Sequence, residues 1–182
     1  MTPQTPTLAF TVDAPALLPG AGLYLMRHGE TDLNAAGVLQ GSIDAPLNAR
    51  GLVQARAAAA GLGTLGLRRL VSSPQRRARQ TADVIAAALA LPVDEIADLR
   101  ERDWGIFEGR PRAGRAEDGT GVEPAAALGA RALAALAAIA PEPGVPVLAV
   151  SHGGLIRALI AALGFAPPEA VANCAVIRLA GR

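Results

Sequence analysis

The sequence predicts an α/β protein with a mainly parallel central sheet and helices on both faces. Two short apolar runs, LYLM (23–26) and VLAV (147–150), end abruptly in polar residues, which is typical of strands buried on both faces. Segments with apolar residues at helical spacing stand between these two runs. Because strands and helices alternate along the chain, the class is α/β and the sheet should be mainly parallel.

The first third of the chain contains signals for three further elements. Residues 1–22 are rich in Pro and Thr, and their LAFTV segment (8–12) predicts an arm or an edge strand. Residues 36–48 contain many turn formers and predict a long loop. From residue 50 to 62 the apolar residues recur at helical spacing and predict a helix. The members of this stripe are Leu52, Ala55, Ala59 and Leu62.

A strand followed by a helix is predicted around the LVSSP segment (70–74). Ser73 is a suitable N-cap, and Pro74 suits the first helical position. The helix should continue to residue 90. Its apolar face comprises Ala78, Ala82, Ile85 and Leu89.

The second half of the chain continues the alternation. Residues 91–109 predict a strand and an irregular loop, whereas 110–122 are polar and without periodicity. An alanine-rich helix is predicted at 123–140, with Leu133, Leu136 and Ile139 as its larger anchors. Further elements are predicted at 146–152 (a strand buried on both faces), 153–164 (a helix) and 175–180 (a last strand). Since we find no internal repeat and no linker, we expect a single domain over residues 1–182.

Composition excludes several classes of function. The formal net charge is only +1, so no global field favours nucleic acid or an acidic membrane surface. All 17 basic residues are arginine, whose forked guanidinium binds anions in a bidentate manner. The single cysteine, Cys174, excludes an internal disulfide framework and favours a reducing compartment. No apolar run approaches the ~18 residues of a membrane span, and the N-terminus does not resemble a signal peptide. We therefore expect a cytoplasmic protein without a nucleic-acid or membrane partner, of open oligomeric state.

The two histidines of the chain have similar settings. His28 follows the LYLM run and His152 follows VLAVS, and the Ser72-Ser73 pair ends a third predicted strand. In an open α/β sheet, ligands bind outside the carboxyl ends of the strands. If these three strands are parallel, both histidines lie at the same edge. Neutral imidazole is a competent nucleophile toward phosphorus, and arginine matches phosphate oxygens. A carboxylic acid would then be needed to protonate the leaving oxygen.

Other interpretations of these residues are open. Each histidine alone suits a hydrogen-bonded structural role, and the two together suit a metal site, although no His-x-x-x-His or similar ligand spacing exists. Ser151 next to His152 suggests a serine hydrolase, but no Gly-x-Ser-x-Gly elbow is present. Glu101 and Asp103 are both candidates for the acid, and the residues alone do not separate them. Glu30 is explained as a first-turn acid favoured by the helix dipole.

The remaining charged and aromatic side chains suit binding, solvated or packing roles. Arg77, at a helix start beside a strand end, suits a phosphate-binding role, whereas Arg76 and Arg79 suit a solvated helix face. The three arginines of the 110–122 segment suit either a solvated loop or an anion funnel; they are Arg110, Arg112 and Arg115. Trp104 and Phe107 are expected to pack under the acid, and Cys174 to behave as a small buried hydrophobe.

Five sequence blocks resemble a known family. They are LYLMRHGETDLN (23–34), LQGSIDAPLNARG (39–51), SSPQRRARQTA (72–82), LRERDWGIFEG (99–109) and AVSHGGLIRALI (149–160). In this order they are similar to the histidine phosphatase superfamily, also called phosphoglycerate mutase-like. The resemblance covers the chain from about residue 23 to 164.

The resemblance implies a role for each matching residue. His28 would be the nucleophile and would be phosphorylated during turnover. Glu101 would be the general acid that protonates the leaving group and then activates water. The phosphate would be surrounded by Arg27, Arg77 and His152. Asn34 and the backbone around Gly153 would add hydrogen bonds, and Gln40 and Gly41 belong to a loop that often touches substrate. The resemblance implies a small phosphorylated substrate and neither a metal nor an organic cofactor.

The chain departs from the family pattern in two places. Pro74 and Gln75 replace commoner residues beside Arg77, which itself is retained. The segment 110–122 is short where relatives carry an extra helix over the site. This predicts an open pocket, broad acceptance of phosphomonoesters, and a phosphatase activity that exceeds mutase activity. A phosphoglycerate mutase-type phosphotransferase and a catalytically idle phospho-ligand-binding module remain the alternatives, and the intact set of site residues argues against the idle module.

Overall fold

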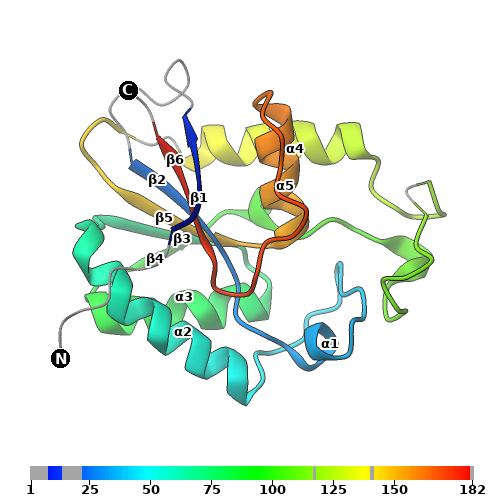
Figure 1. Ribbon diagram of the computed structural model, residues 1–182, viewed down its shortest axis with the longest axis horizontal. Coiled ribbons are helices and arrows are strands. Elements are labelled where there is room, and N and C mark those ends of the chain that lie inside the picture. The colour runs from blue at the N-terminus through cyan, green and yellow to red at the C-terminus, as the bar shows by residue number, and fades with distance from the viewer. Residues whose placement is uncertain (1–7, 14–21, 117, 140–141, 181–182) are drawn as a thin grey trace.

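The computed structural model describes residues 8–13, 22–116, 118–139 and 142–180, and these form a twisted sheet covered by helices (Figure 1). The described residues include six strands in the order β1-β6-β2-β5-β3-β4. The strands are β1 (Leu8–Asp13), β2 (Gly22–Arg27), β3 (Arg69–Ser72), β4 (Val93–Glu95), β5 (Val147–Ser151) and β6 (Val176–Ala180). The helices are α1 (Asp32–Ala35), α2 (Ala49–Leu62), α3 (Arg76–Leu89), α4 (Ala125–Ile139) and α5 (Gly153–Ala162), with short 3-10 helices η1 (Gly63–Leu65), η2 (Ala97–Leu99) and η3 (Gly105–Phe107).

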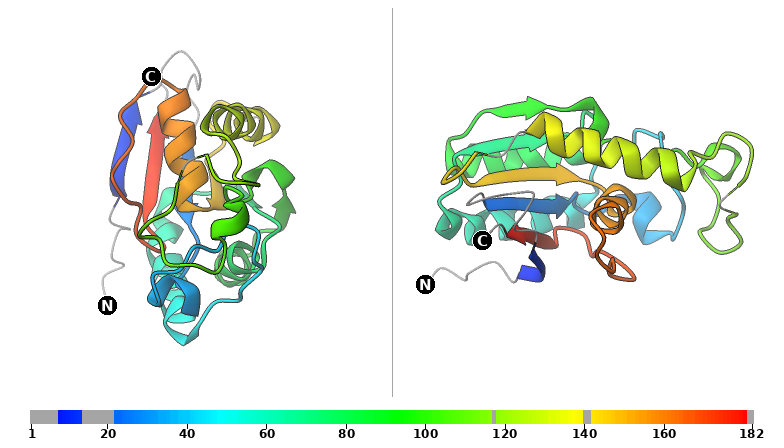
Figure 2. Two further views of the ribbon diagram at one scale, coloured as in Figure 1. Left: turned by 90° about the vertical axis from the view of Figure 1, so that its right-hand side faces the viewer. Right: turned by 90° about the horizontal axis from the view of Figure 1, so that it is seen from above.

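The sheet is mainly parallel, as predicted. Strands β2, β5, β3 and β4 run parallel, whereas β6 pairs antiparallel with β2. The LAFTV segment forms β1 at the sheet edge, where it pairs in parallel with β6. In the right-hand view of Figure 2 the arrowheads of β2 and β5 point toward the same end of the molecule, and the loops that follow them lie there.

Helices cover both faces of the sheet, as the sequence predicts. Helices α2 and α3 lie below the sheet in Figure 1, and α4 and α5 lie above it. Alternate residues of β2 point to the two faces: Leu23 and Leu25 pack in the core under α4 and α5, and Tyr24 and Met26 in the core over α2 and α3. Because side chains on a strand alternate between faces, a strand covered on both sides is apolar throughout.

The start of α3 differs from the expectation. The helix begins at Arg76, and Gln75 at its N-cap makes no side-chain capping hydrogen bond, so Ser73 is not the N-cap and Pro74 is not the first helical residue. Gln75 has an extended backbone (φ −64°, ψ 133°), which excludes it from the helix. The Ser73 hydroxyl instead lies 2.9 Å from His152 Nε2. Thus the residue predicted to cap α3 contacts the second histidine.

The anchors of α4 also differ in part from the expectation. Leu136 and Ile139 are buried, but Leu133 is 41% exposed and is not an anchor. The buried face is centred instead on Leu128, Ala132, Ala135 and Ile139, with Arg131 beside it. An alanine-rich helix offers few large side chains to mark its inward face, so its rotation about its own axis is poorly determined by the sequence pattern.

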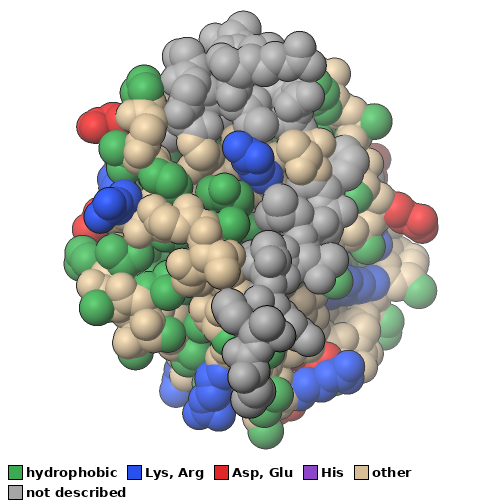
Figure 3. Space-filling view, turned by 60° about the vertical axis from the view of Figure 1, so that its left-hand side comes forward, with side chains coloured by type: hydrophobic (Ala, Val, Ile, Leu, Met, Phe, Trp, Pro, Cys, Tyr) green, Lys and Arg blue, Asp and Glu red, His purple; other side chains and the backbone are tan. Residues whose placement is uncertain are grey.

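Charges of both signs are mixed on one face of the molecule. On the face drawn in Figure 3, basic and acidic side chains are scattered among hydrophobic and other residues and do not gather into one patch. None of the helices in the described ranges has the length and apolar character needed to cross a membrane.

Candidate active site

The three strand ends that carry polar side chains meet at one edge of the sheet. The Arg27 end of β2 is in register with the Ser151 end of β5, and the His28 N–H donates to the Ser151 carbonyl at 2.9 Å. The rings of His28 and His152 lie with their centroids 5.1 Å apart. The prediction that parallel strands bring the two histidines together is therefore confirmed.

The His28 ring is held in one tautomer. Its Nδ1 lies 2.6 Å from the Gly29 carbonyl oxygen, and a carbonyl only accepts, so Nδ1 carries the proton and Nε2 keeps a free lone pair. Burial, and then the charges of Arg77 and Arg27, hold the pKa of His28 well below 6.5. The ring is thus neutral at neutral pH, as a nucleophile requires.

The loop after His28 depends on glycines that let two backbones approach closely. A Cβ on Gly29 would lie 2.6 Å from the Gly51 carbonyl oxygen, at the first turn of α2. The Gly29 N–H also donates to the Thr81 hydroxyl on α3 at 3.0 Å. Helices α2 and α3 therefore fix the backbone on which His28 stands.

Two buried side-chain nitrogens in the described part of the chain have no hydrogen-bond partner, and both belong to predicted phosphate-binding residues. They are His152 Nδ1 and Arg77 Nε. The other guanidinium nitrogens of Arg77 donate to the carbonyls of Ile43 (2.8 Å) and Gly41 (2.9 Å). Buried polar atoms are normally paired, so these two point to a bound ligand. Such a ligand would accept from Arg77 Nε and, in the tautomer with the proton on Nδ1, from His152. Burial, and then Arg77, lower the pKa of His152 well below 6.5.

Arg27 adds a second guanidinium to the pocket. Its Nη1 donates to the Val171 carbonyl at 2.7 Å. Burial, and then the charge of Arg112, lower its pKa to about 10, so it stays charged at neutral pH. With the Asn34 amide oriented to suit its neighbours, the amide oxygen accepts from Arg27 at 3.1 Å and from Arg112 at 3.3 Å.

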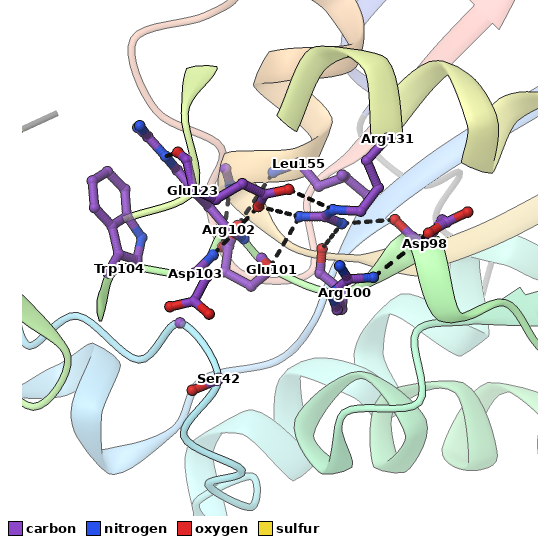
Figure 4. Close-up of polar contacts among 12 residues, drawn as sticks. Ser42, Asp98, Arg100, Glu101, Arg102, Asp103, Trp104, Glu123, Arg131 and Leu155 are labelled. Carbon is purple, nitrogen blue, oxygen red and sulfur yellow. Dashed lines mark hydrogen bonds and ion pairs between the residues drawn. The ribbon is translucent and has the colours of Figure 1, made fainter. Parts of the chain in front are cut away.

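Glu101 lies where the N-terminus of α5 meets the loop after η2. Its carboxylate accepts from the backbone N–H groups of Arg102 (2.9 Å), Gly154 (3.2 Å) and Leu155 (3.2 Å), the last of which is drawn beside it in Figure 4. Asp103 instead accepts from the Gly105 N–H, is exposed, and is absent from the pocket lining. The geometry thus favours Glu101 over Asp103 as the acidic group of the site.

These side chains line a pocket of about 160 Å³. It contains every predicted site residue except His152, whose fully buried ring packs against that of His28, a residue of the lining. The predicted residues in the lining are Arg27, His28, Asn34, Gln40, Gly41, Arg77, Glu101 and Gly153. The others are Leu39, Trp104, Arg112, Arg115, Gly154, Arg157, Glu169, Ala170 and Val171.

The segment 110–122 is only partly as expected. Residues 110–116 and 118–122 contain turns and bends and no helix. Nevertheless Arg112 and Arg115 line the pocket, and Arg110 does not, so the segment contributes cations to a site that the sequence predicts to stand open. Trp104 packs with Val122 and Leu39, and the guanidinium of Arg115 lies 5.2 Å from the centre of its ring. Trp104 is thus both a packing residue and part of the pocket wall.

Gln75 is the most informative residue that sequence reasoning missed. Its Oε1 accepts from the Glu101 N–H at 2.9 Å and from Arg77 at 3.2 Å, and its Nε2 donates to the Gly41 carbonyl at 2.8 Å. One side chain therefore ties together three segments of the site. In the sequence it is visible only as a departure from the family pattern.

The described residues do not form the kind of cluster that a metal site requires. They contain no group of three or more His, Cys, Asp or Glu side chains placed to hold an ion. The cationic groups around the pocket are arginines instead.

Comparison with known proteins agrees with this geometry. A family model described as "Histidine phosphatase superfamily (branch 1)" matches residues 23–181. The uncharacterized phosphatase PhoE of Bacillus subtilis is 38% identical over 151 residues, covering 80% of this chain and 78% of that protein. The probable phosphoglycerate mutase GpmB of Yersinia enterocolitica is 34% identical over 182 residues, covering 86% and 83%. A mycobacterial glucosyl-3-phosphoglycerate phosphatase, solved with VO3, superimposes with a TM-score of 0.78 at 32% identity and covers 89% of this chain and 92% of its own.

Proposed function

This chain belongs to the histidine phosphatase superfamily (branch 1), and from that premise we propose that it is a metal-independent phosphatase that hydrolyses phosphomonoesters through a phosphohistidine on His28. The observation that carries the proposal is the tautomer of His28. Its Nδ1 is committed to the Gly29 carbonyl, so Nε2 is the unprotonated nitrogen on a pocket-lining ring. A neutral imidazole surrounded by fixed arginines is the arrangement that nucleophilic attack on a phosphate dianion requires.

In the first step His28 Nε2 attacks phosphorus and the bond from phosphorus to the ester oxygen breaks. The proton of the Glu101 carboxyl group passes to the leaving oxygen, so the alcohol departs neutral. Arg27, Arg77 and His152 hold the non-bridging oxygens. The unpartnered Arg77 Nε and His152 Nδ1 support this role, because a bound phosphate would supply acceptors for them.

In the second step water attacks the phosphohistidine and the bond from phosphorus to Nε2 breaks. The Glu101 carboxylate takes the proton of the attacking water, so the acid of the first step is regenerated. Inorganic phosphate leaves and His28 returns to its neutral form. The hydrogen bond from Nδ1 to the Gly29 carbonyl keeps the same tautomer throughout the cycle.

Hydrolysis is favoured over mutase chemistry by the segment above the pocket. It contains no helix among its described residues, and we therefore expect water to reach the phosphohistidine. A mutase must hold its intermediate for re-transfer, and an idle binding module would not need the acid. The presence of Arg112 and Arg115 modifies our expectation of broad specificity, because these cations favour small phosphorylated substrates with further anionic groups.

A panel of phosphorylated metabolites tests this function. Purified protein should release inorganic phosphate from several of them and from p-nitrophenyl phosphate, and excess EDTA should not reduce the rate. On 3-phosphoglycerate with 2,3-bisphosphoglycerate added, phosphate release should greatly exceed conversion to 2-phosphoglycerate. Faster mutase turnover would establish the phosphotransferase alternative. Tight binding of phosphate compounds without turnover would establish the idle module, and inactivation by EDTA with recovery on adding a divalent ion would contradict the mechanism.

A further inference from the structure

Arg131 is a buried arginine on α4 that does not line the pocket. Its side chain is 8% exposed. Its Nε and Nη2 bind the two carboxylate oxygens of Glu123 at 2.8 and 2.6 Å. It also donates to three backbone carbonyls: Nη1 to those of Asp98 (2.8 Å) and Arg100 (2.7 Å), and Nη2 to that of Glu101 (3.2 Å) (Figure 4). These five bonds match the five N–H donors of a guanidinium.

All three of those carbonyls belong to residues 98–103, which we call the acid loop because it carries Glu101. Only η2, at its beginning, has regular structure there, so the loop lacks the backbone ladder of a helix or strand. Arg131 supplies hydrogen bonds to the backbone of this loop instead, from a side chain that is not part of the pocket lining. Gln75 and the N-terminus of α5 hold Glu101 from the other directions.

Glu123 extends this support past Glu101. Its carbonyl accepts from the Arg102 Nε at 2.8 Å, and its N–H donates to the Asp103 carbonyl at 2.9 Å. The Arg131–Glu123 pair thus binds the acid loop both before and after the acid. Burial works to raise the pKa of Glu123, but the hydrogen bond and charge of Arg131 outweigh it and lower that pKa below 4.5. The pair is therefore ionised at neutral pH and brings no net charge to the loop.

We propose that Arg131 is a positioning residue for the proton-transfer step, which fixes the distance between the Glu101 carboxyl group and the leaving oxygen without touching the substrate. The proposal rests on the function proposed above. Phosphate binding depends on Arg27 and Arg77, which Arg131 does not contact. Loss of Arg131 should therefore spare substrate affinity and slow the step that needs the acid. A displacement of about 1 Å at a reacting group costs on the order of 10²-fold in rate.

The test compares two leaving groups. p-Nitrophenolate departs without a proton, whereas the alkoxide of glycerol 2-phosphate needs one. Arg131→Gln should lower kcat/KM on glycerol 2-phosphate roughly 10²-fold, with a much smaller change on p-nitrophenyl phosphate, and the inhibition constant of inorganic phosphate should change little. The comparison uses kcat/KM because this ratio reports the steps up to formation of the phosphohistidine, whereas kcat also contains the attack of water, which needs Glu101 for both substrates. Arg131→Lys should restore part of the loss. Arg69→Gln is the matched control, because Arg69 also joins a carbonyl (Ile139) to a carboxylate (Asp94), on a strand away from the acid loop.

A double variant separates positioning from general destabilisation. If Arg131 acts through Glu101, the double variant Glu101→Gln/Arg131→Gln should discriminate between the two substrates no more strongly than Glu101→Gln alone. Independent, multiplying losses would overturn the proposal, as would equal losses on both substrates at equal folded fraction by circular dichroism. If Arg131→Gln does not fold, Arg131→Lys and Glu123→Gln test the proposal through the same comparison of substrates.

The wild-type and Glu101→Gln controls separate this inference from the proposed function. If the wild-type protein hydrolyses neither substrate, the proposed phosphatase function is wrong. If the wild-type protein hydrolyses both substrates and Glu101→Gln lowers the two activities equally, Glu101 is not the general acid. The proposed role of Arg131 is then wrong as well. Selective loss in Glu101→Gln without selective loss in Arg131→Gln overturns the role of Arg131 alone.

Discussion

The N–H of Gly154 donates to the carboxylate of Glu101 at 3.2 Å, and a Cβ on Gly154 would overlap the other oxygen of that carboxylate. The acid therefore lies against a helix N-terminus at a distance that only glycine permits. This contact joins β5, through the first residues of α5, to a loop far from it in the sequence. Residue 154 is therefore a sensitive reporter of the position of the Glu101 carboxylate.

Replacement of this glycine should displace the acid. We expect Gly154→Ala to lower kcat/KM on an alkyl phosphate by more than tenfold, and by much less on p-nitrophenyl phosphate, because only the alkyl leaving group needs a proton in the step that kcat/KM reports. Gly129→Ala on α4 is the control, since its new Cβ would make only an ordinary contact of 3.8 Å with Ala162. Steady-state kinetics on both substrates decide the point. If the ratio of the activities on the two substrates is the same in Gly154→Ala as in the wild type, our placement of Glu101 is wrong.

The arginines of the 110–122 segment should differ in their effects. Arg112→Ala and Arg115→Ala should each raise KM severalfold for a phosphomonoester with a second acidic group, because these side chains line the pocket. The increase should shrink at high ionic strength. Arg110→Ala, in the same segment but outside the pocket, should leave KM unchanged. Equal effects of all three substitutions would mean that the segment acts only by its net charge.

Stability should fall when the solution becomes mildly acidic. Burial lowers the folded-state pKa of both His28 and His152 well below 6.5, near which each titrates when unfolded. Below about pH 6.5 the unfolded chain therefore binds more protons than the folded one. The free energy of unfolding then falls, by up to about 1.4 kcal/mol per pH unit for each histidine, and it is insensitive to these groups above that range.

Urea unfolding in phosphate-free buffer at several values between pH 5.5 and 7.5 measures this effect. His152→Gln should make the dependence on pH shallower below 6.5, because one of the two groups is gone. A variant as pH-dependent as the wild type would show that His152 keeps its ordinary pKa in the fold.

The parts of the fold that follow from short-range patterns were predictable. The doubly buried strands β2 and β5 appear as uninterrupted apolar runs, and parallel pairing then brings His28 and His152 to one edge. The antiparallel direction of β6 was not predictable, because a lone strand at the end of a chain carries no signal of its direction. The start of α3 was mispredicted because the extended backbone of Gln75 delays the helix to Arg76. The contact of Ser73 with His152 is likewise one that no local pattern indicates.

The supporting contacts of the site were the least predictable. Gln75 and Arg131 bind the segment around Glu101 from positions roughly 30 residues away in the chain. Neither residue has a motif or a periodicity of its own, and a polar side chain in an α-helix or at its start is usually solvated. The residues that line the candidate site could be chosen from the motifs, whereas the interactions that hold them in place required the structure.

The direct test of the central claim is the chemical state of His28 during turnover. Protein mixed with ³²P-labelled substrate and quenched rapidly should carry label that is stable to alkali and labile to acid, as a phosphohistidine is, and the label should map to His28. His28→Ala, which keeps the fold by circular dichroism, should carry no label and lose essentially all turnover of p-nitrophenyl phosphate. Label on another residue, or substantial turnover by His28→Ala, would contradict the account.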